Sequence, residues 1–194
     1  MDLTIISVLT LSIYAIYFML PAYLANVSAL AFGGGRPIDF KRNFPDGNRI
    51  LGDGKTWNGA IIAILVGIGV GIIQGLVSLY VIGGFNIYSP LSEYYYNILP
   101  ANILQGALFG LFMGLGAIIG DLCGSFIKRR INIKRGGAAP VLDQLDFVIG
   151  ALLFISLLVS IPLDLIVLII IITLFLHLGS NIIAYLIGMK DVWY

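Results

Sequence analysis

Three aspartates in the second half of the chain are spaced so that they could share a divalent metal ion. Asp121 lies in the segment GDLCGSFIKRR, and Asp143 and Asp146 lie three residues apart in PVLDQLDF. Residues three apart share one face of a helix. Mg²⁺ is bound by a few carboxylates together with water and substrate phosphates. Because the chain has one His and one Cys, no His/Cys cluster exists and the pattern favours Mg²⁺ over zinc.

Each aspartate also has a simpler interpretation. Asp121 could pair with Lys128, which follows it by seven residues on the same helical face as Ser125. Asp143 could stabilise the positive end of a helix dipole, an effect that fades within the first turn and explains Asp146 less well. Asp121 would lie about 10 Å deeper than Lys128 at 1.5 Å per residue. A carboxylate at that depth in a membrane marks a function or a partner.

A second polar cluster, DGNRILGDGKTWNG at 46–59, stands directly before an apolar run. A helix that begins here would present free N–H groups, which attract phosphate, and the glycines would let the backbone approach a ligand closely. Lys55 could donate to phosphate oxygens, and Asp53 could hold a metal ion or orient a base. No Walker pattern is present, so a solvated turn is the alternative. The candidate ligand-binding residues are Asn48, Gly52, Asp53, Lys55, Thr56 and Asn58.

His177 and Asn181 lie four residues apart in an apolar segment near the carboxyl terminus. On a helix they would face the same direction. They could lie near the phosphate or glycerol of a lipid, or they could form a hydrogen-bonded packing pair.

The composition places these residues in a membrane protein. Hydrophobic residues make up 59% and charged residues 11% of the 194 residues, whereas soluble domains have about 25% charged residues. We expect a single all-α domain over 1–194, a polytopic integral membrane protein. Cys123 is the single cysteine of the sequence, so no intrachain disulfide can form. We expect it to be a buried packing residue. The apolar runs predict five transmembrane helices over about 3–24, 59–82, 99–127, 142–160 and 163–188.

The basic residues predict the orientation of these spans. All 11 Lys and Arg residues fall in loop 25–58, in loop 128–141 or in the carboxyl-terminal tail. Basic loops face the cytoplasm, so the amino terminus would lie outside and the carboxyl terminus inside. Seven of the 10 acidic residues lie beside the same loops, which the orientation does not require. We therefore expect a multi-pass protein of the cell membrane whose two cytoplasmic loops form the active site.

Glycines recur every four residues in the second and third spans. Small residues at this spacing let helix backbones approach closely in lipid, so we expect these two spans to be central. Room for a lipid tail against bare backbone is the alternative. The three series are Gly67, Gly71 and Gly75; Gly106, Gly110 and Gly114; and Gly116, Gly120 and Gly124.

The segment 120–147 resembles the signature of the CDP-diacylglycerol synthase family. That signature contains S-x-x-K-R, a short basic and glycine-rich loop, Pro and D-x-x-D. Arg135 and Gln144 depart from it, and so does Val141-Leu142 in place of His-Gly-Gly. The matching residues are Ser125, Lys128, Arg129, Lys134, Pro140, Asp143 and Asp146.

The polar cluster at 46–59 is similar to a loop of the archaeal branch, the CDP-archaeol synthases. The pattern there is close to D-G-x-R-x-x-G-x-x-K-T-x-x-G. Together with the tail IIAYLIGMKDVWY, the resemblance involves three separated motifs and most of the chain. The matching residues are Asp46, Gly47, Arg49, Gly52, Lys55, Thr56 and Gly59.

This resemblance implies a reaction in which CTP and 2,3-bis-O-(geranylgeranyl)-sn-glycerol 1-phosphate give CDP-archaeol and pyrophosphate, with Mg²⁺ required. It implies that Asp121 and Asp146 bind one or two metal ions, with Asp143 assisting. Lys128 and Arg129 would hold phosphates and Ser125 could contact one. The cluster at 46–59 would grip the nucleotide, and the lipid tails would lie in a groove between spans.

Two other functions remain open from the sequence. A small transporter or channel would need charge through both halves of the membrane, whereas charge here is confined to one face. A phosphatidate cytidylyltransferase acting on ester lipids would share the same motifs. We expect no nucleic-acid partner. Oligomeric state and lipid chain length are not predicted.

Overall fold

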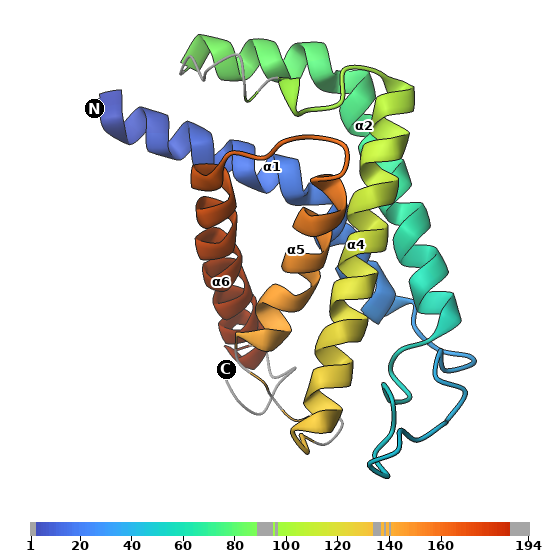
Figure 1. The fold of residues 1–194 in the computed structure, drawn as a ribbon. Coiled ribbons are helices and arrows are strands. Elements are labelled where there is room, and N and C mark those ends of the chain that lie inside the picture. The colour runs from blue at the N-terminus through green and yellow to red at the C-terminus, as the bar shows by residue number, and fades with distance from the viewer. Residues whose placement is uncertain are drawn as a thin grey trace.

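Helices make up the regular structure of this protein. The computed structural model describes residues 3–88, 95, 97–133, 137, 139 and 141–186. Among these residues all extended regular elements are helices, which confirms an all-α fold. The helices are α1 (Leu3–Ala31), α2 (Trp57–Tyr88), α4 (Ile103–Arg130), α5 (Leu142–Ile155) and α6 (Leu163–Leu186) (Figure 1).

Four of the predicted spans correspond to helices that could cross a membrane. These segments are Ser7–Ala31, Trp57–Ser78, Ile103–Arg130 and Leu163–Ile182. The fifth helix, α5, has only 14 residues, about 21 Å at 1.5 Å per residue. This is less than the roughly 30 Å of a bilayer's hydrocarbon core. A multi-pass membrane protein is therefore supported, while the count of five spans stays a prediction.

Two helix boundaries differ from the predicted ones. The first helix continues past Leu24 to Ala31. The third span begins at Ile103 rather than at Leu99, because the side chain of Asn102 accepts from the backbone N–H of Gln105 and caps α4.

The main hydrophobic core forms around α1. Tyr14, Phe18 and Met19 of α1 are fully buried, and they belong to one cluster with Met113 of α4 and Ile169 of α6. The second and third predicted spans, α2 and α4, pack closely against each other, and α2 also packs against α1. The helix α4 contributes to the main core, whereas none of the described residues of α2 does.

Glycines allow α4 to pack closely against both α2 and α5. A Cβ at Gly71 would overlap the carbonyl oxygen of Gly106. A Cβ at Gly116 would lie 2.5 Å from the carbonyl oxygen of Gly150 in α5. Apart from Gly124, which faces the side chain of Asp146, the glycines of the three series face neighbouring backbone. This confirms close packing and not room for a lipid tail. Cys123, two turns further along α4, is exposed, so the expectation that it is buried is wrong.

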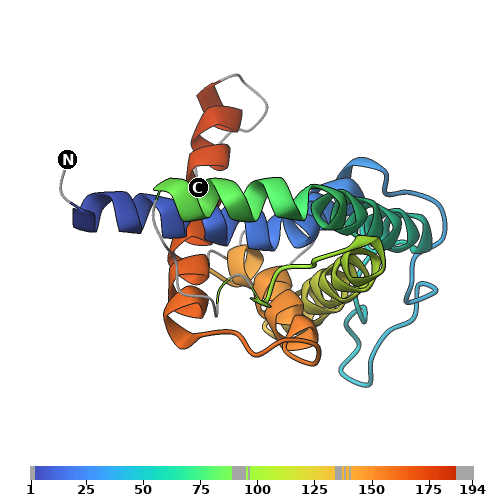
Figure 2. The same ribbon diagram turned by 90° about the horizontal axis from the view of Figure 1, so that it is seen from above.

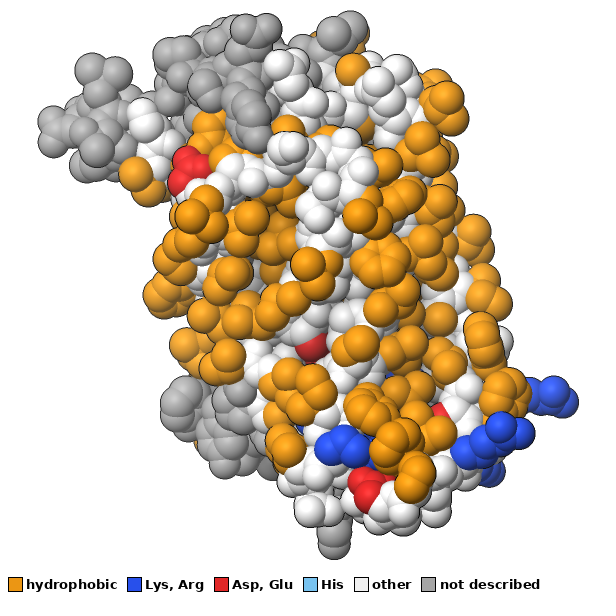
Figure 3. All heavy atoms as spheres, in the orientation of Figure 1, with side chains coloured by type: hydrophobic (Ala, Val, Ile, Leu, Met, Phe, Trp, Pro, Cys, Tyr) orange, Lys and Arg blue, Asp and Glu red, His pale blue; other side chains and the backbone are white. Residues whose placement is uncertain are grey.

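The polar segments gather at one end of the helical bundle. The loop 32–56, the end of α4, the start of α5 and the end of α6 lie at the bottom of Figure 1. Seen from above, α6 crosses α1 while α4 and α5 run together on one side (Figure 2). Hydrophobic side chains cover the middle of the molecule, and the Lys and Arg side chains in view lie near the polar end (Figure 3). This arrangement brings the two predicted loops together.

Candidate active site

A cavity of about 570 Å³ opens at the polar end of the bundle. Helices α1, α2, α4, α5 and α6 all contribute to its lining, as does the loop before α2. The structure therefore brings together residues of the polar cluster at 46–59, of the segment 120–147 and of the pair His177 and Asn181. The predicted site residues that line it are Lys55, Thr56, Asp121, Lys128, Asp143, Asp146, His177 and Asn181.

Asp121 forms an ion pair with a lysine from the polar cluster at 46–59. Lys55 Nζ lies 2.7 Å from Asp121 Oδ1 and 2.6 Å from Oδ2. Both side chains keep partial contact with solvent, at 27% and 19% exposure. The pair joins the loop before α2 to α4 across 66 residues of sequence.

Lys128 forms a second ion pair, across the α4–α5 connection. Its Nζ lies 2.6 Å from Asp143 Oδ1, and Asp143 Oδ2 accepts from the backbone N–H of Ala139 at 3.0 Å. The predicted alternative in which Asp121 pairs with Lys128 is therefore not formed. Each lysine instead pairs with a carboxylate from a different segment. The cavity therefore contains two ammonium groups and two carboxylates joined in ion pairs.

Asp146 occupies a space that a glycine in α4 leaves open. A Cβ at Gly124 would lie 2.7 Å from the Cβ and 2.8 Å from the Cγ of Asp146. Asp146 Oδ1 accepts from the backbone N–H of Phe147 at 2.6 Å. No ion pair found among the described residues includes Asp146. The glycine series therefore positions a carboxylate beside Asp121 as well as packing the helices.

The polar loop is folded around a buried aspartate, Asp39, whose side chain has no exposure. Its carboxylate accepts from the Arg49 guanidinium at 2.8 Å and from the backbone N–H groups of Lys41, Leu51 and Gly52. Burial raises the pKa of Asp39, but these hydrogen bonds outweigh it and hold the pKa well below its usual range. Asp39 thus stays ionised and organises the loop that carries Lys55.

Arg130 fastens this loop to the end of α4. Its guanidinium lies over the rings of Phe44 and Phe126, 4.6 and 4.7 Å from their centroids. Its Nε also lies 3.2 Å from Asp46 Oδ2. A cation between two aromatic faces and beside a carboxylate is held in one orientation, so the loop and α4 keep a defined spacing.

Thr56 starts α2 and fixes the position of the neighbouring Lys55. Its hydroxyl oxygen accepts from the backbone N–H of Gly59 at 3.2 Å, as an N-cap residue does. It also accepts from the backbone N–H of Gly34 at 3.1 Å. The hydroxyl predicted to grip a nucleotide is therefore engaged with backbone, at the edge of the cavity.

His177 and Asn181 face the cavity from α6. Asn181 Nδ2 lies 3.4 Å from His177 Nδ1, and Asn181 is only 7% exposed. Both the packing pair and the position beside a ligand space are thus present. Their helix brings them near the charged cluster although they lie more than 30 residues later in the sequence.

The other predicted site residues lie outside the cavity lining. Asn48 bonds to Asn132, and Asp53 pairs with Arg49 at 3.0 Å. Gly52 adopts a φ of 112°, which favours glycine. The residues that the structure places away from the lining are Asn48, Gly52, Asp53, Asn58, Ser125 and Arg129.

Carboxylates suited to a magnesium ion line the cavity, although they do not form a closed cage. Within the described part of the chain, no group of three or more His, Cys, Asp or Glu side chains is arranged to hold a metal ion. Mg²⁺ commonly takes one or two protein carboxylates and fills its remaining positions with water and phosphate oxygens. The donor set of Asp121 and Asp146, beside two lysines, fits that mode of binding.

Sequence reasoning missed the residues that shape the cavity. Asp39 and Arg130 were not singled out because their role depends on contacts between distant segments. Asn26 and Ser180 also line the cavity. A polar residue inside an apolar helix was a usable signal for Asn26, but the predicted span ended before it.

Comparison with known proteins identifies the family. The CarS-like family model, described as CDP-archaeol synthase, matches residues 5–194. A CDP-archaeol synthase of Methanocaldococcus jannaschii is 48% identical over 180 residues, which are 93% of this chain and 96% of that protein. The chain belongs to the CDP-archaeol synthase family. A second member, from Methanothermobacter thermautotrophicus, is 50% identical over 182 residues, 94% of each chain.

A solved structure agrees with this family in fold. It is described as "an intramembrane enzyme for archaeal membrane lipids biosynthesis" and has a TM-score of 0.71 with 37% sequence identity. The match covers 87% of this chain and 92% of that one. The resemblance to CDP-archaeol synthases that the three motifs carry is therefore confirmed.

Proposed function

We propose that this protein is a CTP-dependent cytidylyltransferase that makes CDP-archaeol for archaeal membrane lipids. In the reaction, a phosphate oxygen of 2,3-bis-O-(geranylgeranyl)-sn-glycerol 1-phosphate attacks the α-phosphorus of CTP. A new P–O bond forms, the bond from the α-phosphorus to the bridging oxygen breaks, and pyrophosphate leaves. The observation that carries the proposal is the cavity of this CDP-archaeol synthase family member, where two lysines and three aspartates from separate motifs meet.

The lysines neutralise the two anions that must approach each other. Lys55 and Lys128 each pair with a carboxylate at 2.6 Å. Either lysine can move its hydrogen bonds from carboxylate to phosphate, because both ammonium groups lie at the ends of flexible side chains. The lipid phosphate is already ionised and needs no strong base. Catalysis then depends on holding the two phosphates in line and stabilising the developing charge.

Asp121 and Asp146 would hold Mg²⁺, with Asp143 assisting. The metal ion, when bound, would supply charge neutralisation to the reacting phosphates. Gly124 has no side chain and therefore leaves room for the side chain of Asp146. Asp121 becomes available when Lys55 turns to phosphate. One ion or two would both satisfy this chemistry.

The nucleotide lies toward the polar loop and the lipid toward the membrane. The loop acts on the nucleotide through its shape, which Asp39 and Arg49 maintain. His177 and Asn181 face the lipid phosphate or glycerol. The apolar part of the lining, which includes Val27, Leu30, Ile118 and Leu122, continues toward the hydrophobic surface and suits the first part of the lipid tails.

The protein crosses the cell membrane five times with this site on the cytoplasmic side. The 11 basic residues at one end support that orientation, and CTP is available there. Because α5 is short, the segment 156–160 completes the fourth span. The family assignment leaves no support for a transporter. An ester-lipid phosphatidate cytidylyltransferase would share the cavity and differ only in the lipid that it accepts.

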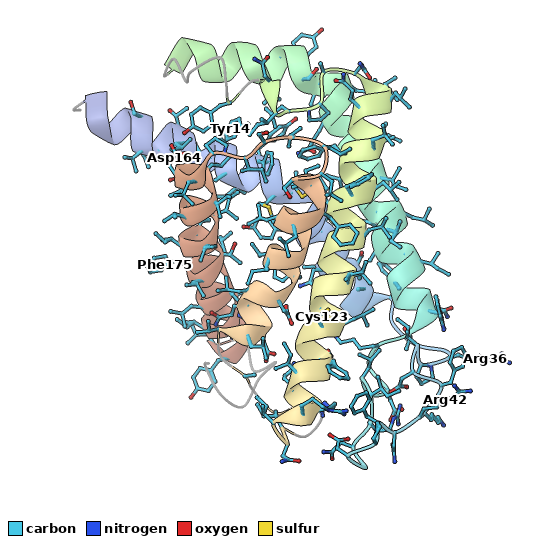
Figure 4. The ribbon with its side chains drawn as sticks, viewed as in Figure 1. Tyr14, Arg36, Arg42, Cys123, Asp164 and Phe175 are labelled. Carbon is cyan, nitrogen blue, oxygen red and sulfur yellow. The ribbon has the colours of Figure 1, made fainter. Side chains whose placement is uncertain are left out.

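Pyrophosphate release from the detergent-purified protein tests this function. Release is expected only when CTP, Mg²⁺ and the geranylgeranyl ether lipid phosphate are all present. Asp121→Asn should reduce it by at least about 100-fold, since a charged ligand of the proposed metal ion is lost. Asp164→Asn is the matched control, because Asp164 lies at the other end of the molecule (Figure 4). Full activity in a folded Asp121→Asn protein would remove the metal site from the proposal.

A further inference from the structure

We propose that the loop between α1 and α2 carries a binding surface for the headgroups of anionic lipids in the surrounding bilayer. This surface, the loop headgroup surface, consists of Arg36, Phe40, Lys41, Arg42 and Trp57. It lies outside the cavity lining and does not depend on the reaction proposed above. Three features of the structure lead to it.

The first feature is a continuous apolar stripe along α2. Ile61 and Leu65 are 53% and 61% exposed and follow Trp57 by four and eight residues. They therefore share its helical face. The helix α2 is long enough to cross the membrane, so its exposed apolar side chains face lipid. Trp57 is the first residue of this helix, so it marks the level where hydrocarbon gives way to headgroups, the position that tryptophan favours.

The second feature is an aromatic residue of the loop placed beside Trp57. The rings of Phe40 and Trp57 have centroids 6.5 Å apart, and Phe40 is 60% exposed. Phe40 and Lys41 have φ values of 48° and 61°, a left-handed conformation that is uncommon outside glycine. The buried Asp39 fixes this turn by accepting from the backbone N–H of Lys41. A costly backbone conformation is thus maintained where it directs Phe40 and Lys41 outward.

The third feature is charge. Arg36, Lys41 and Arg42 are exposed, and none of the ion pairs found among the described residues includes them. Figure 4 shows Arg36 and Arg42 close together, directed away from the helical bundle. In Figure 3, Lys and Arg side chains project from the polar end beside exposed hydrophobic side chains.

Cations beside an aromatic pair at the membrane level match the phosphate layer of anionic lipids. Each Lys or Arg near such a layer adds attraction, which salt weakens. A soluble protein partner would have no reason to meet the lipid-facing stripe of α2, because that stripe continues into the bilayer. The continuity of the stripe with the cations therefore identifies the lipid headgroup as the occupant.

Quenching of Trp57 fluorescence by brominated lipids tests the proposal. The chain has two tryptophans, so Trp193→Phe leaves Trp57 as the reporter. This protein is reconstituted in phosphatidylcholine vesicles that contain either brominated phosphatidylglycerol or brominated phosphatidylcholine. Phosphatidylglycerol should be preferred near Trp57 by at least about fivefold, the contribution of one cation at an anionic surface. The preference should fall when salt is raised.

Two variants separate charge from structure. R36Q/K41Q/R42Q should lose the preference, while R36K/K41R/R42K should keep it. Both should unfold in neutral detergent at the same temperature as the parent protein, which shows that they are folded. Equal quenching by the two brominated lipids in the parent protein would overturn the proposal. A preference that survives in R36Q/K41Q/R42Q would also overturn it, and so would the absence of any quenching of Trp57.

Discussion

Replacing Lys55 with methionine tests whether Lys55 competes with a metal ion for the carboxylate of Asp121. Lys55 Nζ lies within 2.7 Å of both carboxylate oxygens of Asp121. In the parent protein a metal ion must therefore break this pair to reach Asp121. Phosphate arriving with the metal gives Lys55 a new partner, so the metal ion and CTP should bind together much better than either one alone. Methionine keeps an unbranched side chain, one heavy atom shorter than lysine, and removes the charge.

The expected size of the effect follows from the contact that is lost. A hydrogen bond to a charged group contributes about 1.5 to 3 kcal/mol, and each 1.4 kcal/mol changes an equilibrium constant about tenfold. Lys55→Met should therefore bind a metal ion alone roughly 10 to 100 times more tightly, because Asp121 is no longer occupied. It should bind metal–CTP more weakly by a similar factor, because one phosphate donor is missing.

Titration with Mn²⁺, followed by the electron paramagnetic resonance signal of the free ion, measures both quantities. One series contains CTP and the other does not. Lys41→Met is the matched control, because Lys41 is exposed and lies outside the cavity lining; its two affinities should equal those of the parent. If Lys55→Met binds Mn²⁺ alone no more tightly than the parent does, then Asp121 is not a metal ligand that Lys55 competes for, and the reasoning is refuted.

Three further predictions concern packing and acid stability. Gly71→Ala should lower the free energy of unfolding by about 1–3 kcal/mol through overpacking, measured by thermal unfolding in detergent, while Gly69→Ala, with nothing within 4 Å of its Cβ, should not lower it. Gly124→Ala should reduce turnover much more than melting temperature, because the added methyl group displaces Asp146; equal losses would argue against this positioning role. Asp39→Asn should lower the melting temperature at pH 7. Hydrogen bonds outweigh burial and lower the folded pKa of Asp39, so its stabilisation is present above the unfolded pKa of about 3.9 and declines as pH falls below it. The difference between Asp39→Asn and the parent should therefore narrow below pH 4; a constant difference would contradict the ionised Asp39.

Patterns within one helix were readable from the sequence. The apolar runs predicted the helices, and the four-residue spacing of glycines predicted their close packing, because both depend on helical periodicity alone. The motifs also predicted that Lys55, Asp121 and Lys128 share a site, and all three line the cavity.

Contacts between segments were much less readable. Lys128 pairs with Asp143 and Asp121 with Lys55, although an internal pair of Asp121 with Lys128 satisfied the same helical spacing. Several equivalent pairings were available, and only the packing of α4 against α5 and the loop selects one. Asp39 resembles an ordinary loop aspartate until Arg49 and three backbone N–H groups are placed around it.

Transfer of a labelled phosphorus atom tests the central claim most directly. The purified protein is given the ether lipid phosphate and Mg²⁺ with CTP labelled at the α-phosphorus or, separately, at the γ-phosphorus. The proposed reaction moves the α label into the organic-soluble lipid as CDP-archaeol and leaves the γ label in pyrophosphate. Label from the γ position in the lipid, or no labelled lipid from folded protein supplied with all three components, would contradict cytidylyl transfer at this cavity.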